Sequence, residues 1–349
     1  SSAEGGFRLS ALIWPTLPAK GRQGVIHLMH ADGTPGFALS IGQNGAEAVF
    51  GDTTLTTGKT FRRRIWYRVW ATLDTASGTL SVGQALLGPR SLIDDEGISD
   101  TRISSASTQG LSHVLIAALE ADTQTGHYNG KIDSPRVADR ALSAIEMESL
   151  KTWPVATELG NSVIGAWDFS ADIKGLKVSD RSANLLHGEI VNLPARAMTG
   201  WNWNGEEMNW THAPDQYGAI HFHDDDIYDA GWEIDFELTI PKGMKSGVYA
   251  ARLRAGEHED HIPFAVRAPR GKPTAKVLYL MPTASYQAYA NEHMNTDSPV
   301  GQLLAGRMIQ LDKFNLFLNE HREYGGSCYD SHSDGSGICY SSRLRPILN

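Results

Sequence analysis

The feature that most constrains the fold is a series of short apolar runs, bounded by turn residues, between Phe7 and Ile132. Apolar and polar side chains alternate in these runs, which is typical of half-buried β-strands. Glycine-containing pairs between the runs favour tight turns. The pattern predicts a mainly β fold in which strands build a sandwich. The clearest runs are residues 24–29, 36–41, 66–71 and 113–118, and the turn pairs are Asp32-Gly33, Asn44-Gly45 and Ser77-Gly78.

Size and charge exclude several classes of protein. The chain has 349 residues, which is long enough for two or three domains. Its formal charge of −9 and its short basic runs predict no nucleic-acid partner, because such binding needs clustered Lys and Arg. A membrane span would need roughly 18 or more consecutive apolar residues, and no such run occurs.

Two cysteines, Cys328 and Cys339, are too few for a disulfide-rich secreted scaffold. We therefore expect reduced thiols and a cytoplasmic protein, with a local disulfide between the two cysteines as the alternative.

The end of the first region is marked by a strand pattern followed by a short helix. Ser143 is placed to cap the helix, and Glu146 completes a capping box. The strings "NGKIDSPRV" and "ALSAIEME" resemble the end of a laminin-G or concanavalin-like jelly roll. The resemblance implies a jelly roll over residues 1–155, and it leaves function open because this sandwich occurs both in lectins and as a passive part of enzymes.

A second β region follows. Residues 163–170 and 180–188 look like the opening of a similar module, and they could also supply strands that complete the first sandwich. Further strands are predicted at residues 218–223, 232–238, 247–253 and 261–266. We therefore expect a β-sandwich unit over 156–270, which ends at a turn-rich linker.

A continuous apolar run, residues 276–281, lies between Pro273 and Pro282. Such a run is typical of a buried strand in a parallel sheet. It predicts that a glutamine-amidotransferase-like α/β domain begins near residue 271. Because residues 271–349 are too few for a doubly wound sheet, we expect this domain to be incomplete and the natural polypeptide to continue.

Several short motifs could carry chemistry. His221 and His223 lie two residues apart on a predicted strand, so both could reach one metal ion. The acidic run that follows them suits a solvated turn, and a structural role is the stronger interpretation. Ser327 and Ser336 lack the setting of a nucleophile elbow. The cysteines could act as nucleophiles beside His321 or His332, although sequence neighbours are rarely catalytic partners.

Tyrosines gather near the end of the sequence, at Tyr286, Tyr289, Tyr324 and Tyr329. The first two follow the predicted parallel strand, where α/β folds place their sites. Because a phenol has a pKa near 10, phenolate ligands imply a hard Lewis acid such as ferric iron. Aromatic packing at an interface would explain the tyrosines about as well.

Longer segments between residues 201 and 349 match a known family. They read "AIHFHDDDIYDAGWEIDFELTIPKGMKSGVYAARL", "IPFAVRAP", "KVLYLMPTASYQAYANEH" and "REYGGSCYDSHSDGSGICYSSRLRPILN". Together they resemble the large (beta) subunits of the N,N-dimethylformamidase family. The resemblance implies hydrolysis of a linear amide, N,N-dimethylformamide, to formate and dimethylamine. It also implies one mononuclear ferric iron per active site, held by two tyrosines and one glutamate.

The same resemblance assigns roles to residues. Tyr289, in "YQAY", and Tyr329, in "GSCYD", are the implied iron ligands, with Tyr286 and Tyr324 as alternatives. His293 and His332 are candidate hydrogen-bond partners of the ligands. The carboxylate ligand and the general base are expected outside this chain, and His221 and His223 become scaffold residues.

The family works as a hetero-oligomer. We therefore expect a small subunit, a second large subunit, the remaining C-terminal part of the large subunit and a small formamide substrate as partners. Tryptophans between Trp201 and Trp210 could serve such an interface. The alternative function is a non-catalytic, lectin-like carbohydrate-binding module, for which Asp94-Asp95-Glu96 is the candidate calcium edge.

Overall fold

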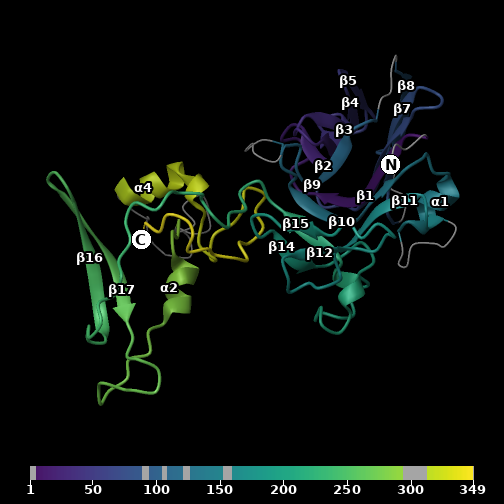
Figure 1. Cartoon of the computed structure of the whole chain (residues 1–349). Helices are drawn as coiled ribbons and strands as arrows, with labels where there is room; N and C mark the ends of the chain where they lie inside the picture. The colour runs from purple at the N-terminus through teal and green to yellow at the C-terminus, as the bar shows by residue number, and fades with distance from the viewer. Residues whose placement is uncertain are drawn as a thin grey trace, which may run out of the picture.

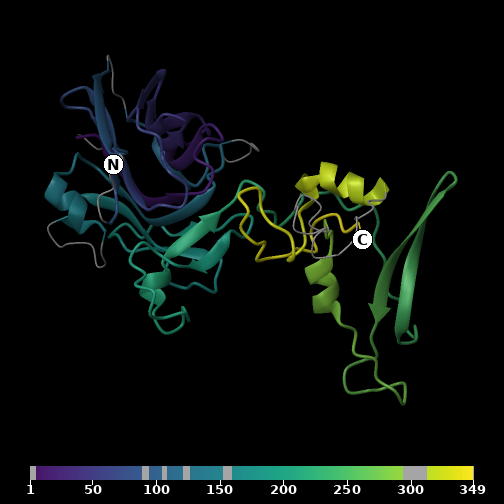
Figure 2. The same cartoon turned by 180° about the vertical axis from the view of Figure 1, so that it is seen from behind.

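The computed structural model describes residues 5–88, 94–103, 108–120, 126–151, 159–293 and 313–348. Its described part is mainly β with a few short helices (Figure 1). Strands stacked in two sheets form one end of the molecule, and a β-hairpin with two helices forms the other (Figures 1 and 2). The ladders between named strands are antiparallel. The predicted mainly β class is confirmed.

The two stacked sheets contain most of the strands. The large sheet runs in the order β13 (Gly188–Glu189), β12 (Lys177–Asp180), β11 (Val163–Asp168), β10 (Gly130–Ala138), β1 (Phe7–Pro15), β6 (Tyr67–Asp74), β7 (Thr79–Leu86) and β8 (Gly97–Arg102), with β14 (Ala195–Met198) and β15 (Ala219–Phe222) attached beside β10. The smaller sheet runs in the order β5 (Thr53–Thr56), β4 (Gly45–Phe50), β3 (Pro35–Gly42), β2 (Gln23–His30) and β9 (Leu111–Ile116).

One hydrophobic core joins the two sheets. Alternate residues of each strand point inward, so Leu9 and Ile13 of β1 meet Leu39 of β3 and their neighbours without solvent exposure. A second, smaller cluster covers the outer face of the large sheet. Helix α1 (Ala144–Ser149) contributes Met147 to this cluster, which packs with Trp70 of β6.

The start of α1 has the geometry predicted from its sequence. The Ser143 hydroxyl accepts a hydrogen bond of 3.3 Å from the Glu146 backbone N–H, and the Glu146 carboxylate accepts one of 2.8 Å from the Ser143 N–H. The capping box is therefore confirmed.

The large sheet extends beyond the first predicted domain. Arg136 to Ala138 of β10 pair with β11, and residues 130–133 of the same strand pair with β15. Residues 163–180 thus complete the first sandwich, as one of the two sequence interpretations expected. Gly130 permits this crowded arrangement, because it has φ of +137° and a Cβ there would lie 2.4 Å from the Trp14 carbonyl oxygen. The domain boundaries at residues 155 and 270 stay predictions.

The chain then leaves the sandwich. Strands β16 (Gly247–Ala255) and β17 (His258–Val266) form a separate hairpin, which lies far from the stacked sheets in both views (Figures 1 and 2). The remaining helical elements are η2 (Pro214–Tyr217), α2 (Thr283–Tyr289), α4 (Lys313–Glu320) and η3 (Arg322–Tyr324). None of the helices in the described ranges is long and apolar enough to cross a membrane.

Two predicted strands are wrong in this structure. Residues 232–238 are irregular, and Phe236 is 52% exposed. Residues 276–281 form no ladder, and Leu278 is 91% exposed. The physical reason is the same for both segments: within the described residues no neighbouring strand pairs with them, and their large apolar side chains stay mostly exposed. The α/β arrangement expected for 271–349 stays a prediction.

The core can be tested at Leu39. Replacing it with Ala removes buried methyl groups and leaves a cavity, which should lower the free energy of unfolding by about 2–5 kcal/mol. Ile98→Ala is the matched control, because Ile98 is 70% exposed. Urea unfolding of both variants measures the effect, and equal losses would contradict the described core.

Candidate functional site

Two groups of side chains form where distant segments meet one stretch of the chain, residues 327–337. We name Tyr289 and Tyr329 the tyrosine pair. The histidine cluster consists of His221, His223 and His332 with the carboxylates that surround them, Asp225, Asp226 and Asp334. The first group lies beside α2, and the second lies at the end of β15.

The tyrosine pair comes from two separate segments. Tyr289 is the last residue of α2, and Tyr329 lies 40 positions later in an irregular loop. Their rings stack with centroids 4.2 Å apart and planes inclined by 20°. A hydrogen bond with Tyr329 raises the pKa of Tyr289 above its usual value. Both phenols are about half exposed, at 48% and 54%, so an ion or a small molecule has access to them.

The two alternative tyrosines lie apart from this pair. Tyr286 forms a hydrogen bond with Tyr279, which raises the pKa of Tyr279. Tyr324 stacks on His321 at 5.4 Å and meets the Trp232 ring edge-on at 6.1 Å. Of the four tyrosines considered from sequence, the structure therefore brings together Tyr289 and Tyr329.

Asn291 holds together the segments around the pair. It is fully buried and adopts a left-handed backbone with φ of +59°, which Asn tolerates better than most residues. Its amide donates to the Pro346 carbonyl at 2.7 Å, and its side-chain oxygen accepts from the Leu348 N–H at 2.8 Å. The Cys328 N–H donates to the Ala288 carbonyl at 2.8 Å, which ties the Tyr329 loop to α2.

Asp330 fixes the backbone next to Tyr329. Its carboxylate accepts from the Ser327 N–H and hydroxyl, both at 2.8 Å, and from the His293 N–H at 3.1 Å. Burial by itself would raise the pKa of Asp330, but these hydrogen bonds hold it below its usual range. Ser327 is thereby a buried partner of Asp330, and its geometry does not resemble that of a nucleophile.

His293 is the sequence candidate that lies close to the pair. Its Nδ1 is 3.2 Å from the Asp330 carboxylate, and its Nε2 is 2.9 Å from the Leu318 carbonyl oxygen. Both ring nitrogens face protein oxygens, so neither is directed at a substrate. The contacts are those of a residue that positions Asp330 and, through the backbone, Tyr329.

Arg345 also connects the segments around the tyrosine pair. Its guanidinium donates to the carbonyls of Gly326 at 2.7 Å and Ala290 at 3.1 Å. Burial lowers the pKa of Arg345. Sequence analysis missed Asn291, Asp330 and Arg345. A helix-end Asn was the one available signal, since Asn often ends helices in the left-handed conformation.

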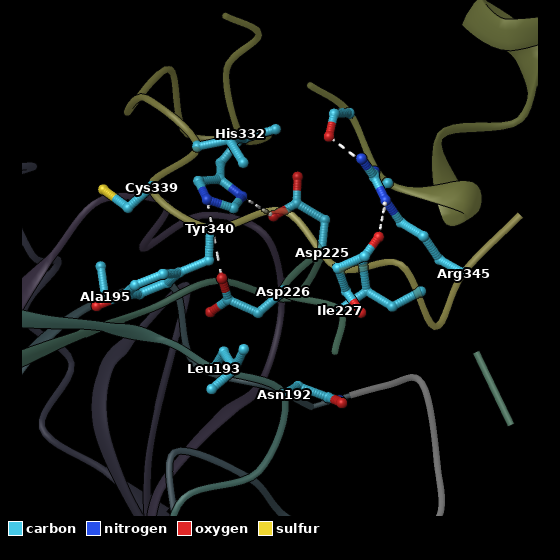
Figure 3. Close-up of a pocket in the computed structure, with 14 residues that line it drawn as sticks. Asn192, Leu193, Ala195, Asp225, Asp226, Ile227, His332, Cys339, Tyr340 and Arg345 are labelled. Carbon is cyan, nitrogen blue, oxygen red and sulfur yellow. Dashed lines mark hydrogen bonds and ion pairs between the residues drawn. The ribbon is translucent and has the colours of Figure 1, made fainter. Parts of the chain in front are cut away.

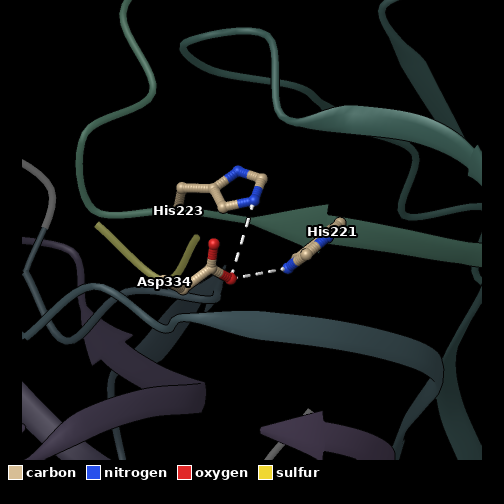
Figure 4. A group of neighbouring side chains, drawn as sticks. All are labelled: His221, His223 and Asp334. Carbon is tan, nitrogen blue, oxygen red and sulfur yellow. Dashed lines mark hydrogen bonds and ion pairs between the residues drawn. The ribbon is translucent and has the colours of Figure 1, made fainter. Parts of the chain in front are cut away.

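The histidine cluster begins at β15 (Figure 4). His221 and His223 project toward Asp334, with Nε2 atoms 3.1 Å and 4.0 Å from its Oδ2. The three side chains are almost fully buried. Burial would raise the pKa of Asp334, yet hydrogen bonds from His221 and Ser336 hold it far below its usual range. Burial also lowers the pKa of His221, against the opposing effect of Asp334.

His332, the other sequence candidate, belongs to this cluster and not to the tyrosine pair. Its ring stacks on His223 with centroids 3.7 Å apart. Its Nδ1 lies 2.7 Å from the Asp225 carboxylate. Burial lowers the pKa of His332, but the hydrogen bond to Asp225 and the negative charges of Asp225, Asp226 and Asp334 together raise it above its usual value. A pocket adjoins these groups and is lined by residues that include Asp225, Asp226, His332, Cys339 and Arg345 (Figure 3).

The structure gives no support to the remaining sequence candidates, which are the two cysteines and the acidic residues Asp94 and Asp95. Both cysteines are free thiols, so the alternative of a local disulfide is wrong for this structure. Burial of the sulfur raises the pKa of Cys339, which disfavours a reactive thiolate. Asp95 pairs with Arg62 at 2.7 Å and Asp94 with Lys59 at 2.6 Å, so this acidic edge is occupied by internal contacts.

Comparison with known proteins identifies relatives of this chain. It is 39% identical to the N,N-dimethylformamidase beta subunit of Paracoccus aminophilus and 36% identical to that of an Alcaligenes species, each over 99% of this chain. The chain is a homologue of N,N-dimethylformamidase beta subunits. A family model described as "N,N-dimethylformamidase beta subunit-like, C-terminal" also matches residues 195–349. The resemblance stated from sequence is confirmed, and the chain spans about half the length of these relatives, 49% of each.

The similarity to solved structures is weaker. A putative carbohydrate-binding protein from Bacteroides ovatus covers 53% of this chain and 51% of its own length, with 16% identity and a TM-score of 0.40. The carbohydrate-binding module of a Ruminococcus gnavus sialidase covers 41% of this chain and 80% of its own, with 17% identity and a TM-score of 0.33. These scores are too low to support an inference about a ligand.

The His332–Asp225 pair predicts a pH dependence. Because the pKa of His332 is raised in the folded state, its contribution to stability is fully present below about pH 6.5 and is lost as pH rises through the folded-state value. The difference in free energy of unfolding between the wild type and His332→Gln should therefore be larger at pH 5.5 than at pH 9. Urea unfolding at both pH values measures this difference.

His113→Gln provides the control for this measurement, because His113 is exposed on β9 and has no carboxylate partner among the described residues. A difference for His332→Gln that stays constant or grows with pH would contradict the His332–Asp225 pairing.

Proposed function

We propose that this chain forms part of an amide hydrolase that converts N,N-dimethylformamide to formate and dimethylamine at a mononuclear ferric iron. Tyr289 and Tyr329 would be the phenolate ligands. The observation that carries the proposal is the stacking of these two phenols, from distant segments, in a homologue of N,N-dimethylformamidase beta subunits. The bond cleaved is the C–N bond of a linear amide.

The donor set fits such an ion in part. Two phenol oxygens are hard donors, which suits ferric iron better than softer metals. The raised pKa of Tyr289 means that this phenol is protonated before an ion binds, so binding would release its proton and strengthen with pH. Two donors do not complete a coordination shell. We propose that the carboxylate ligand and the general base come from outside these 349 residues.

The residues around the pair would serve to hold it in place. Asp330, bonded to Ser327 and His293, keeps the Tyr329 loop fixed, and Asn291 fixes the end of α2 after Tyr289. A bound ferric ion would polarise the formyl oxygen and lower the pKa of a nearby water. Ligands held by packed neighbours lose little entropy when they bind, which increases affinity and keeps their geometry.

Iron content and activity test the ligand pair. Tyr289→Phe and Tyr329→Phe should each lose iron and its charge-transfer absorption. Hydrolysis of N,N-dimethylformamide should fall by about 100-fold or more, because metal assistance is worth several kcal/mol. The measurements are metal analysis, a visible spectrum and steady-state kinetics on the intact assembly.

Tyr286→Phe and Tyr324→Phe are the matched controls, and they should keep both iron and colour. Loss of iron in a control together with its retention in Tyr289→Phe would reject the proposed pair. A colourless, iron-free wild type that still hydrolyses formamides would overturn the iron mechanism.

Exposed apolar side chains support the proposal that this chain is part of a larger assembly. Leu278 is 91% exposed and Leu280 is 86% exposed. We propose that residues 276–281 are covered in an α/β domain completed by further large-subunit sequence. A small subunit and a second large subunit would complete a cytoplasmic hetero-oligomer. The tryptophans expected to serve an interface, Trp201, Trp203 and Trp210, are half-buried.

Burial of residues 276–281 can be measured in the full-length protein. Leu278→Asp should destabilise it by at least about 3 kcal/mol, because a buried unpaired charge is costly. Ile145→Asp is the control, since Ile145 is 84% exposed on α1. Thermal unfolding of the two variants decides the matter, and equal small effects would mean that residues 276–281 remain uncovered.

A further inference from the structure

The histidine cluster surrounds a buried carboxylate. The Asp334 side chain has no exposed surface, and its Oδ2 lies 3.1 Å from His221 Nε2. Its Oδ1 accepts hydrogen bonds from the Ser336 N–H and hydroxyl. The guanidiniums of Arg63 and Arg64 donate to the main-chain carbonyl oxygen of Asp334, at 3.4 Å each. Oδ2 therefore faces imidazole nitrogens, and a cation placed between them would gain an anionic ligand.

The three side chains are also arranged like metal ligands. The Nε2 atoms of His221 and His223 and the Asp334 carboxylate oxygen all lie within 4.8 Å of one another. Two ligands of a tetrahedral zinc ion, each about 2.0–2.2 Å from the metal, lie roughly 3.3 Å apart. The observed distances to Asp334 Oδ2, 3.1 Å and 4.0 Å, lie on either side of that value.

A further carboxylate orients one of the rings. Asp226 lies 3.2 Å from His223 Nδ1, on the side of the ring opposite Asp334. Metal-binding histidines almost always donate their second N–H to such a group, because this fixes the tautomer and leaves Nε2 with its lone pair. The His332 ring stacked on His223 restricts its rotation further.

We propose that His221, His223 and Asp334 bind one zinc ion, which fastens the loop at residues 331–337 to β15. The ion would take the place of the proton that His221 Nε2 shares with Asp334. The fourth position would hold a water near the Ser336 hydroxyl, which lies 2.9 Å from His223 Nε2. Since the ligands are almost fully buried, the role is structural, and it does not depend on the iron proposed at the tyrosine pair.

Metal titration of the full-length protein tests this site. After removal of bound metal, isothermal titration with zinc chloride should show one tight site. Cobalt(II) chloride should give the visible absorption of a tetrahedral ion. His223→Gln and Asp334→Asn should each lose zinc affinity by more than about 100-fold, and Asp226→Asn by about 10–100-fold. His113→Gln should bind as the wild type does.

The iron proposal is separated by measuring zinc in Tyr289→Phe, which should still bind one equivalent. The zinc proposal is overturned if the wild type binds no equivalent of zinc, or if cobalt gives no tetrahedral spectrum. It is also overturned if Asp334→Asn binds zinc as tightly as the wild type. The wild-type spectrum alone can reject the zinc site. The test therefore remains decisive even if a variant fails to fold.

Discussion

The rest of the structure depends on the pairing of β10 with three other strands. One edge of β10 is held along its length by β1, whereas its other edge is divided between β15 and β11. The division adds β15 to the large sheet, so that Ile220 enters the core and His221 points to the opposite face. A glycine at residue 130 is what lets β10 pass close enough to β1 for this to happen. The position of His221 is therefore fixed by main-chain hydrogen bonds, which are insensitive to most surface substitutions.

Beyond β15, buried carboxylates replace the hydrophobic core as the organising element. Asp330 and Asp334 each collect hydrogen bonds from backbone N–H groups and hydroxyls of their own loop. Each also accepts from a histidine of a distant segment. Such networks order a loop that has little apolar surface to bury, because a buried polar group without partners would be costly. Such a loop is sensitive to substitution, because losing one hydrogen-bond partner leaves the buried group that it paired with unsatisfied.

Sequence predicted the sandwich and the capping box because both follow from local rules: side-chain alternation, glycine turns and the spacing of Ser143 and Glu146. It also singled out Tyr289 and Tyr329, through a family resemblance. It could not place Asp334 beside His221, because their 113-residue separation is closed only by tertiary packing. The apolar run at 276–281 predicted a strand that the structure does not contain, because a strand needs a neighbour and the described chain supplies none.

Tyr329 and Asp334 belong to the same short loop, with Asp330 and His332 between them. Whatever restrains one end of that loop reduces the conformational entropy left at the other. If the tyrosine pair binds iron as proposed, occupancy of that site and attachment of the loop to the sandwich would be linked equilibria. A change that favours one would favour the other by the same free energy. The sandwich, although remote from the phenols, would then influence how strongly they bind the ion.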